Sequence, residues 1–161
     1  MTKNEYRFSY EVYDSIDELS GDDALLLKEA QKATQNAYAP YSQFRVGAVA
    51  RMANGQLVTG FNQENASFPV GICAERVLLS AAASLFPNQP IQSIAISYQS
   101  NNGGSDHPIT PCGICRQSLQ EYEMRTGQSI RLILGGMEGK IYVIGSAGSL
   151  LPLGFTSDEL K

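Results

Sequence analysis

The sequence has few of the features that several classes of protein require. It contains three cysteines, an odd number, and its first ten residues have no apolar signal-peptide core, which argues against a secreted disulfide framework. No apolar run approaches the ~18 residues of a membrane-spanning helix. Lys and Arg form no cluster and the net charge is −4, which disfavours nucleic acid and membranes as partners. We therefore expect a soluble, cytoplasmic protein.

Length and composition are those of one folded domain. The chain has 161 residues, of which 43% are hydrophobic and 17% charged, and a typical domain has roughly 100–200 residues. No repeat, linker or low-complexity tract divides the sequence. We expect an N-terminal arm over residues 1–20 and a single domain over residues 21–161.

Hydrophobic periodicity predicts alternating helices and strands. Alternating aromatics in residues 6–13 suggest a short strand in the arm, and residues 99–110 are polar and glycine-rich, as expected of a loop. The helices are expected over about residues 22–40, 73–86, 112–124 and 146–151, and the strands over 45–52, 57–63, 91–98, 130–136 and 140–145. This order predicts an α/β fold, a three-layer sandwich in which a mixed sheet of about five strands has helices on both faces.

The three cysteines indicate a metal site. Cys112 and Cys115 form a C-x-x-C pair, which alone fits either a redox couple or half of a metal site. Cys73, which lies 39 positions upstream (112 − 73), favours the metal. Cys73 and Cys112 each stand where a helix is expected to begin, and the partial positive charge of a helix N-terminus lowers the pKa of a thiol. Three sulfur ligands suit one zinc ion per chain.

Two neighbouring residues leave the type of zinc site open. His107, the single histidine, could complete a closed structural site with three sulfur ligands and one nitrogen ligand. Glu75 follows Cys73 by two positions and could simply interact with the helix dipole. If the fourth zinc position instead holds water, Glu75 could move the proton of that water.

Two motifs in the sequence resemble those of a known enzyme family. Residues 73–76 read Cys-Ala-Glu-Arg, and residues 111–117 read Pro-Cys-Gly-Ile-Cys-Arg-Gln. Together they resemble the zinc-dependent cytidine deaminases, whose signature combines His or Cys ligands with a glutamate that does not bind zinc. Residues 40–48, 62–72 and 150–155 also resemble family segments. The resemblance extends over roughly residues 22–160.

The resemblance implies both an activity and a fold. It implies a cytidine deaminase-like sandwich that hydrolyses cytidine and 2′-deoxycytidine to uridine and 2′-deoxyuridine with release of ammonia, in pyrimidine salvage. Cys73, Cys112 and Cys115 would hold Zn²⁺, whose hydroxide would attack C4 of the base. Glu75 would be the catalytic residue that shuttles protons.

The resemblance also implies residues that bind the nucleoside. Asn62 and Glu64 would hydrogen-bond the ribose, and Phe44 would line the base pocket. Three thiolates on Zn²⁺ leave a formal charge of −1. Arg76, or Arg116 as a second candidate, could offset this charge by hydrogen-bonding the thiolate sulfurs. Deaminases of this kind are homotetramers whose subunits share pockets. At such an interface we expect residues that reach a neighbouring subunit's site: Ala66, Phe68 and Phe155.

Two departures from the family pattern leave other substrates open. Phe68 stands where tyrosine is usual, and Arg45 stands where proline is common. The alternative is a related zinc aminohydrolase that acts on a different aminonucleoside. A second alternative is a non-catalytic zinc module that uses His107. A polynucleotide deaminase normally needs a basic strand-binding channel, and it is disfavoured because the net charge is −4 and Lys and Arg are scattered.

Overall fold

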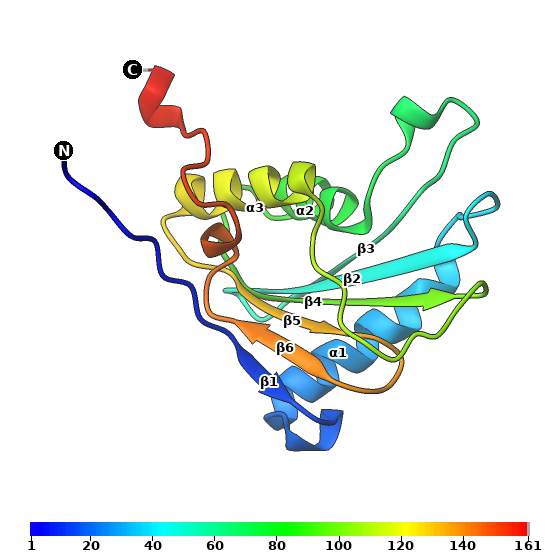
Figure 1. Ribbon diagram of the computed structural model, residues 1–161. Helices are drawn as coiled ribbons and strands as arrows, with labels where there is room; N and C mark the ends of the chain where they lie inside the picture. The colour runs from blue at the N-terminus through cyan, green and yellow to red at the C-terminus, as the bar shows by residue number, and fades with distance from the viewer. Residues whose placement is uncertain (161) are drawn as a thin grey trace.

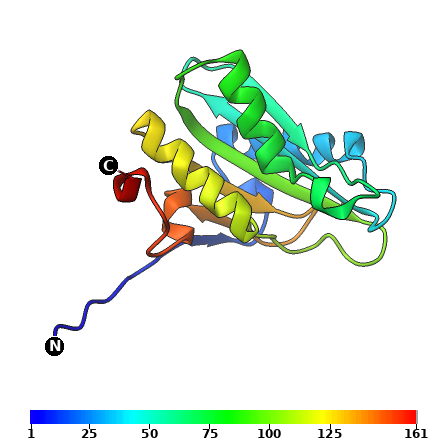
Figure 2. The same cartoon turned by 90° about the horizontal axis from the view of Figure 1, so that it is seen from above.

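The computed structural model, which describes residues 1–160, has three layers (Figure 1). A six-stranded sheet separates helix α1 (Gly21–Ala33) from helices α2 (Ala74–Leu85) and α3 (Gly113–Thr126). Seen from above, α2 and α3 lie side by side across the same face of the sheet (Figure 2). The expected α/β sandwich is therefore confirmed. Lys161, the last residue of the expected domain, lies outside the described residues.

The sheet is mixed. Its strands are β1 (Glu11–Tyr13), β2 (Phe44–Met52), β3 (Leu57–Phe61), β4 (Ile91–Ser100), β5 (Arg131–Gly135) and β6 (Ile141–Ile144). They lie in the order β1-β6-β5-β4-β2-β3, and only β4 and β5 are parallel. Helix α3 connects these two strands, as a parallel crossover requires. The β2–β3 hairpin turns at Asn54-Gly55, where Gly55 has a φ of 83°.

The short strand predicted in the arm is present, and it joins the five predicted strands of the domain as the sixth strand of the sheet. β1 pairs antiparallel with β6 at one edge of the sheet, where Val12 lies opposite Tyr142. The strand begins only at Glu11, although the aromatic alternation starts at Tyr6. β6 is four residues long, so it pairs with no more than a short segment of the arm. The residues before β1 run away from the body of the molecule (Figure 1).

Two apolar clusters hold the three layers together. On β4, Ile94 and Ile96 face the cluster beneath α2 and α3, whereas Ala95 faces the cluster beneath α1. On β5, Leu132 and Ile133 divide in the same way. Because both faces of these central strands are covered, their sequences are continuous apolar runs.

Two glycines let helices approach the sheet closely. A Cβ atom on Gly60 in β3 would overlap the Ala74 carbonyl and the Leu78 backbone nitrogen of α2. A Cβ atom on Gly47 in β2 would likewise overlap the Ala30 carbonyl of α1. The first turn of α2 is therefore seated directly on β3, which fixes the position of the residues that begin this helix.

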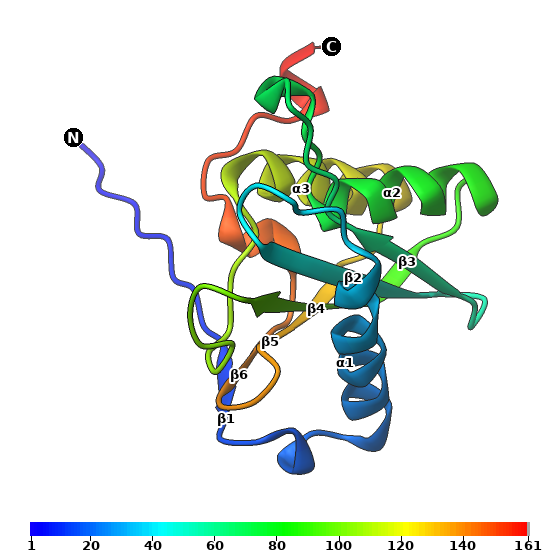
Figure 3. The same ribbon diagram turned by 90° about the vertical axis from the view of Figure 1, so that its right-hand side faces the viewer.

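Several connections are single 3₁₀ turns. Helix α1 ends at Ala33 and continues only as one such turn, so the helix is shorter than the sequence predicts. The 3₁₀ segments are Ile16–Glu18, Thr34–Asn36, Phe68–Val70, Ala147–Leu150 and Ser157–Leu160. The turn over Phe68–Val70 belongs to the long connection that projects between β3 and α2 (Figure 3). Among residues 1–160, no helix has the length and apolar character needed to cross a membrane.

Candidate metal centre and active site

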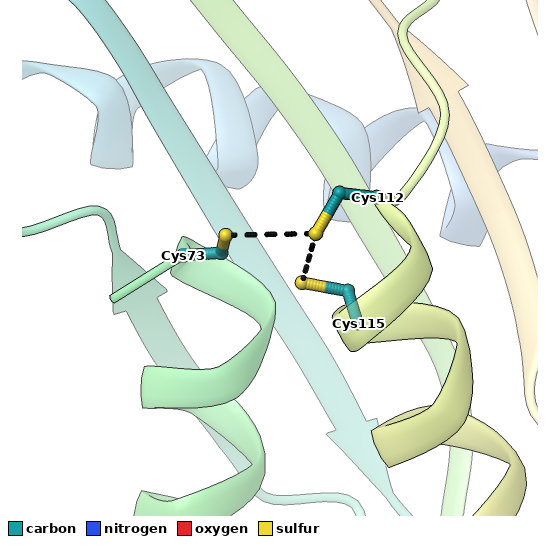
Figure 4. Close-up of side chains that lie close together, drawn as sticks. All are labelled: Cys73, Cys112 and Cys115. Carbon is teal, nitrogen blue, oxygen red and sulfur yellow. Dashed lines mark hydrogen bonds between the residues drawn. The ribbon is translucent and has the colours of Figure 1, made fainter. Parts of the chain in front are cut away.

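The three cysteines converge at the N-termini of two helices. Cys73 immediately precedes α2, Cys112 immediately precedes α3, and Cys115 lies in the first turn of α3. The Sγ atoms of Cys73 and Cys112 are 3.8 Å apart, and those of Cys112 and Cys115 are 3.5 Å apart. All three sulfur atoms lie within 4.8 Å of one another and point toward a common centre (Figure 4).

This donor set fits zinc. Among the His, Cys, Asp and Glu side chains of residues 1–160, these three cysteines form the one group of three or more that lie closely enough together to hold a metal ion. The cysteines are free thiols, which suit a soft or borderline metal such as Zn²⁺. Three protein ligands leave one position of a tetrahedral ion for water or substrate.

The local electrostatics favour a thiolate at Cys73. Hydrogen bonding from the thiols of Cys115 and Cys112, together with the positive charge of Arg76, lowers the pKa of Cys73 to about 6 against the opposing effect of burial. The same thiol pairing and burial raise the pKa of Cys115. The surroundings of Cys73 therefore favour its thiolate, which is the form that binds a metal.

Glu75 lies beside this cluster and is almost completely buried. Its side chain is in the first turn of α2, and the residue is only 5% exposed. Burial, followed by repulsion from the Cys73 sulfur, raises the pKa of the Glu75 carboxyl above its ordinary value. A carboxyl in this environment can both hold and release a proton at the metal centre.

A cavity of about 800 Å³ opens onto the cluster. Its walls come from the start of β2, the segment after β3, the start of α2 and the loop before α3. Among residues 1–160, Glu64 and Glu75 are the carboxylates that line it, and no Lys, Arg or His side chain does so. The cavity is large enough for a small polar ligand such as a nucleoside.

Asn62 and Glu64 line the cavity and hold its rim in place. The Asn62 side chain accepts a hydrogen bond from the Val46 amide at 2.8 Å and donates one to the Phe44 carbonyl at 2.9 Å. A Glu64 carboxylate oxygen accepts from the amide of Tyr41 at 2.8 Å and from that of Ser42 at 3.3 Å. Hydrogen bonding by Ser42, then by the Tyr41 amide, lowers the pKa of Glu64, so this carboxyl is ionised.

The structure separates the predicted apolar site residues into two groups. Phe44 and Phe68 line the cavity, Phe44 half-buried and Phe68 at the rim with 76% of its surface exposed. Ala66 and Phe155 lie outside the cavity of their own chain. Phe155 is 58% exposed, and its backbone carbonyl accepts a hydrogen bond from Gln117.

Arg116 differs from the sequence expectation. Its guanidinium donates to the carbonyls of Pro111 and Leu150 at 2.8 and 3.1 Å and to the Thr110 hydroxyl at 3.2 Å. These acceptors lie in the loop before Cys112 and in the C-terminal region, so Arg116 ties backbone segments together instead of bonding to sulfur. Arg76 remains the arginine whose charge acts on Cys73.

His107 does not complete the metal site. Its Nδ1 lies 3.0 Å from the Tyr98 hydroxyl, and the histidine is not part of the sulfur group. Within the described residues, this geometry removes the basis for a closed site with three Cys ligands and one His ligand.

Sequence reasoning missed Tyr98, which stacks against Phe44 with ring centroids 4.9 Å apart. Tyr98 ends an apolar run that is typical of a core strand. The one sequence signal that could have indicated a role near the site was its position immediately before a polar loop. Ile109 and Thr110, which also line the cavity, carried no motif of their own.

The fold and the site together define a class of protein. A three-layer sandwich that places three thiols at two helix N-termini, with a buried glutamate beside them, has the ligand type and the non-ligating glutamate of the zinc deaminases. Residues 20–128 match the family model described as the cytidine and deoxycytidylate deaminase zinc-binding region. The chain belongs to this family, and its cofactor is zinc.

Individual relatives cover most of the chain. A cytidine deaminase from Halalkalibacterium halodurans is 36% identical over 140 residues, which are 87% of this chain and 98% of the relative. A crystal structure of cytidine deaminase from Burkholderia pseudomallei has a TM-score of 0.72 at 35% identity and covers 85% of this chain and 100% of its own. The structure of cytidine deaminase from Mycobacterium tuberculosis gives a TM-score of 0.64 at 30% identity, with 84% and 98% covered.

Proposed function

We propose that this protein catalyses the hydrolytic deamination of cytidine and 2′-deoxycytidine to uridine and 2′-deoxyuridine, with release of ammonia. The observation that carries the proposal is the burial of Glu75 beside three convergent thiols in a cavity of nucleoside size. The cytidine deaminases from H. halodurans and B. pseudomallei, which align over almost their full lengths, support cytidine as the substrate.

In this proposal, Glu75 moves the protons of the reaction. Water that attacks C4 of the cytosine ring must lose a proton, while ring N3 and the departing amino group must each gain one. The Glu75 carboxylate takes the first proton from water and delivers it to N3. It then transfers the remaining hydroxyl proton to the amino group, which leaves as ammonia. Cys73, Cys112 and Cys115 would hold zinc, which when bound would supply the Lewis acidity that makes water nucleophilic at neutral pH.

The charges of the cavity favour a nucleoside over a nucleotide. The family model covers both cytidine and deoxycytidylate deaminases, whose substrates differ by a phosphate. A bound phosphate is normally neutralised by Arg or Lys. Among the residues that the structure describes, no cationic side chain lines the cavity. Glu64, whose pKa is lowered, lines it with a carboxylate that suits a ribose hydroxyl donor.

We further propose a homotetramer with shared active sites, acting in the cytoplasm in pyrimidine salvage. Ala66, Phe68 and Phe155 are exposed in one subunit, so a neighbouring chain can reach all three. The catalytic domain would span residues 21–161. Residues 1–20 would form an N-terminal arm that precedes this domain and adds β1 to its sheet, and the family match begins at residue 20.

An absorbance assay with a substrate panel tests the proposal. The panel contains cytidine, 2′-deoxycytidine, cytosine, cytidine monophosphate and 5-methylcytidine, each with purified, zinc-loaded protein. We expect turnover of the first two and little or none of the monophosphate. Turnover of 5-methylcytidine without turnover of cytidine would indicate that the protein is instead a related aminohydrolase that acts on a different aminonucleoside. If the monophosphate were the best substrate, the charge argument would be wrong.

A further inference from the structure

Tyr98 lies directly behind one wall of the cavity. The residue is at the C-terminal end of β4, is only 1% exposed and does not itself line the cavity. Its ring stacks on Phe44 with a centroid distance of 4.9 Å and an interplanar angle of 22°. Since Phe44 does line the cavity, the position of the Tyr98 ring limits how far the Phe44 ring can move away from a ligand.

The hydroxyl of Tyr98 is held by the polar loop that follows β4. It lies 3.0 Å from Nδ1 of His107, and the two rings meet edge to face at 5.5 Å. It also donates to the Gly104 carbonyl at 3.4 Å. His107 in turn contacts the carboxylate of Asp106 at 3.2 Å. The loop thus contacts both the hydroxyl and the ring of Tyr98.

This loop is fixed to the sheet despite its glycine-rich sequence. The Met137 amide donates to the Ser105 carbonyl at 2.6 Å. A Cβ atom on Gly136 or Gly139 would overlap the backbone of Ser105 or Asp106, so the loop rests directly on the β5–β6 turn. Figure 1 shows the connection after β4 running back past this turn. Because the loop is held in place, His107 has a defined position beside the Tyr98 hydroxyl.

The same loop holds the segment that leads into β2. Asn102 donates from its side chain to the Ser42 carbonyl at 3.0 Å, and Asn101 donates to the Gln43 side chain at 3.2 Å. Gln43 has a left-handed backbone with a φ of 55°, which a non-glycine residue adopts only when its surroundings enforce it. The loop therefore constrains Phe44 from behind, through Tyr98, and along the chain, through Ser42 and Gln43.

We propose that Tyr98, held by His107, is a positioning residue that sets the Phe44 ring as a wall of the nucleoside pocket. This inference rests on the proposed function, since it names the ligand of that pocket. Tyr98 does not touch the reacting atoms. Its loss should therefore weaken nucleoside binding and leave the chemical step intact.

The test compares single-hydroxyl deletions at two buried tyrosines. Tyr98→Phe removes the hydroxyl that contacts His107, and His107→Ala removes the exposed partner, whose side chain is 64% exposed. The matched control is Tyr122→Phe, because Tyr122 is 4% exposed and its hydroxyl donates to the Gln89 carbonyl at 3.1 Å, away from the cavity. Each variant is assayed for cytidine kcat and KM, zinc content and equilibrium binding of uridine.

We expect Tyr98→Phe and His107→Ala to raise KM and the uridine Kd by about two- to tenfold, the range for one lost hydrogen bond. Their kcat and zinc content should stay near wild type. His107→Gln should restore most of the affinity, because its amide can still bond to the Tyr98 hydroxyl. Tyr122→Phe should change neither constant.

Three results would overturn the inference. They are unchanged KM and uridine Kd in both variants, a lower kcat at constant KM, or an equal rise of KM in Tyr122→Phe. If wild-type protein neither deaminates nor binds a nucleoside, the proposed function itself fails. That outcome is separate, because it is read from the wild type before any variant is compared.

Discussion

Glu75 carries the chemistry at the scale of single residues. Glu75→Gln keeps the size of the buried side chain and removes its ability to accept a proton. We expect turnover to fall by ~10²–10⁴ or more, the usual contribution of a general acid–base group. Zinc content, measured by atomic absorption on the same sample, should be unchanged. Near-normal turnover in this variant would exclude Glu75 as the proton shuttle.

Arg76 affects the same site through its charge. Because its charge lowers the pKa of Cys73, Arg76→Gln should weaken zinc binding and reduce turnover less than Glu75→Gln does. Competition with a chromogenic chelator measures the zinc affinity. Arg76 and Arg125 both line an outer groove between α2 and α3, but Arg125 stacks on the Tyr122 ring. Arg125→Gln is therefore the control. Equal zinc affinities in both variants would contradict the charge argument.

Residue spacing predicted the metal site well and its surroundings less well. Cys73, Cys112 and Cys115 could be found because a metal requires specific ligand types, and these converge as expected. The contacts of Arg116 could not be predicted, because its acceptors are backbone carbonyls that come near it only after folding. Tyr98 was missed for a similar reason, since a stacked ring has no sequence motif.

Helix α2 brings Cys73 and Glu75 to the site because it lies close to β3. Gly60→Ala would place a methyl group against the Ala74 carbonyl and the backbone nitrogen of Leu78, and thus push the first turn of α2 outward. Overpacking of this kind costs about 1–3 kcal/mol, so we expect a comparable loss in the free energy of unfolding together with weaker zinc binding. Urea denaturation and chelator competition measure the two effects.

Gly21→Ala provides the control for this prediction. Gly21 begins α1, and a Cβ atom added there would meet no neighbouring atom within 4 Å. Alanine favours a helix over glycine by roughly 1 kcal/mol in helix interiors, so Gly21→Ala should be neutral or stabilising. If both alanines were equally tolerated, close packing of β3 against α2 would not position the site.

Prediction from the sequence was most accurate for elements with a strong pattern. The Asn54-Gly55 hairpin and helices α2 and α3 lie close to where periodicity places them. The end of α1 was set too late, because Ala37 continues the helical spacing although regular helix stops at Ala33. The extent of β1 depends on the length of its partner β6, which no local pattern in the arm records.

At the scale of the whole molecule, the exposed Phe155 allows the shared-pocket proposal to be tested. Two impaired variants, Glu75→Gln and Phe155→Ala, are mixed after mild dissociation and allowed to reassociate. If Phe155 serves the pocket of a neighbour, random assembly should give about a quarter of the sites both intact residues. Activity should then rise above that of either parent.

Light scattering and a labelled-subunit exchange assay control this experiment. They establish that the wild type is oligomeric and that the two variants exchange subunits. A monomeric wild type, or exchange without any rise in activity, would exclude a pocket shared through Phe155.

The most direct test of the central claim is the product stoichiometry of cytidine turnover as zinc is removed and returned. Purified protein should convert cytidine to equal amounts of uridine and ammonia. It should lose this activity when a chelator strips the metal and recover it when one zinc ion per chain is restored. Folded protein with one zinc ion per chain that releases no ammonia from cytidine or 2′-deoxycytidine would contradict the account.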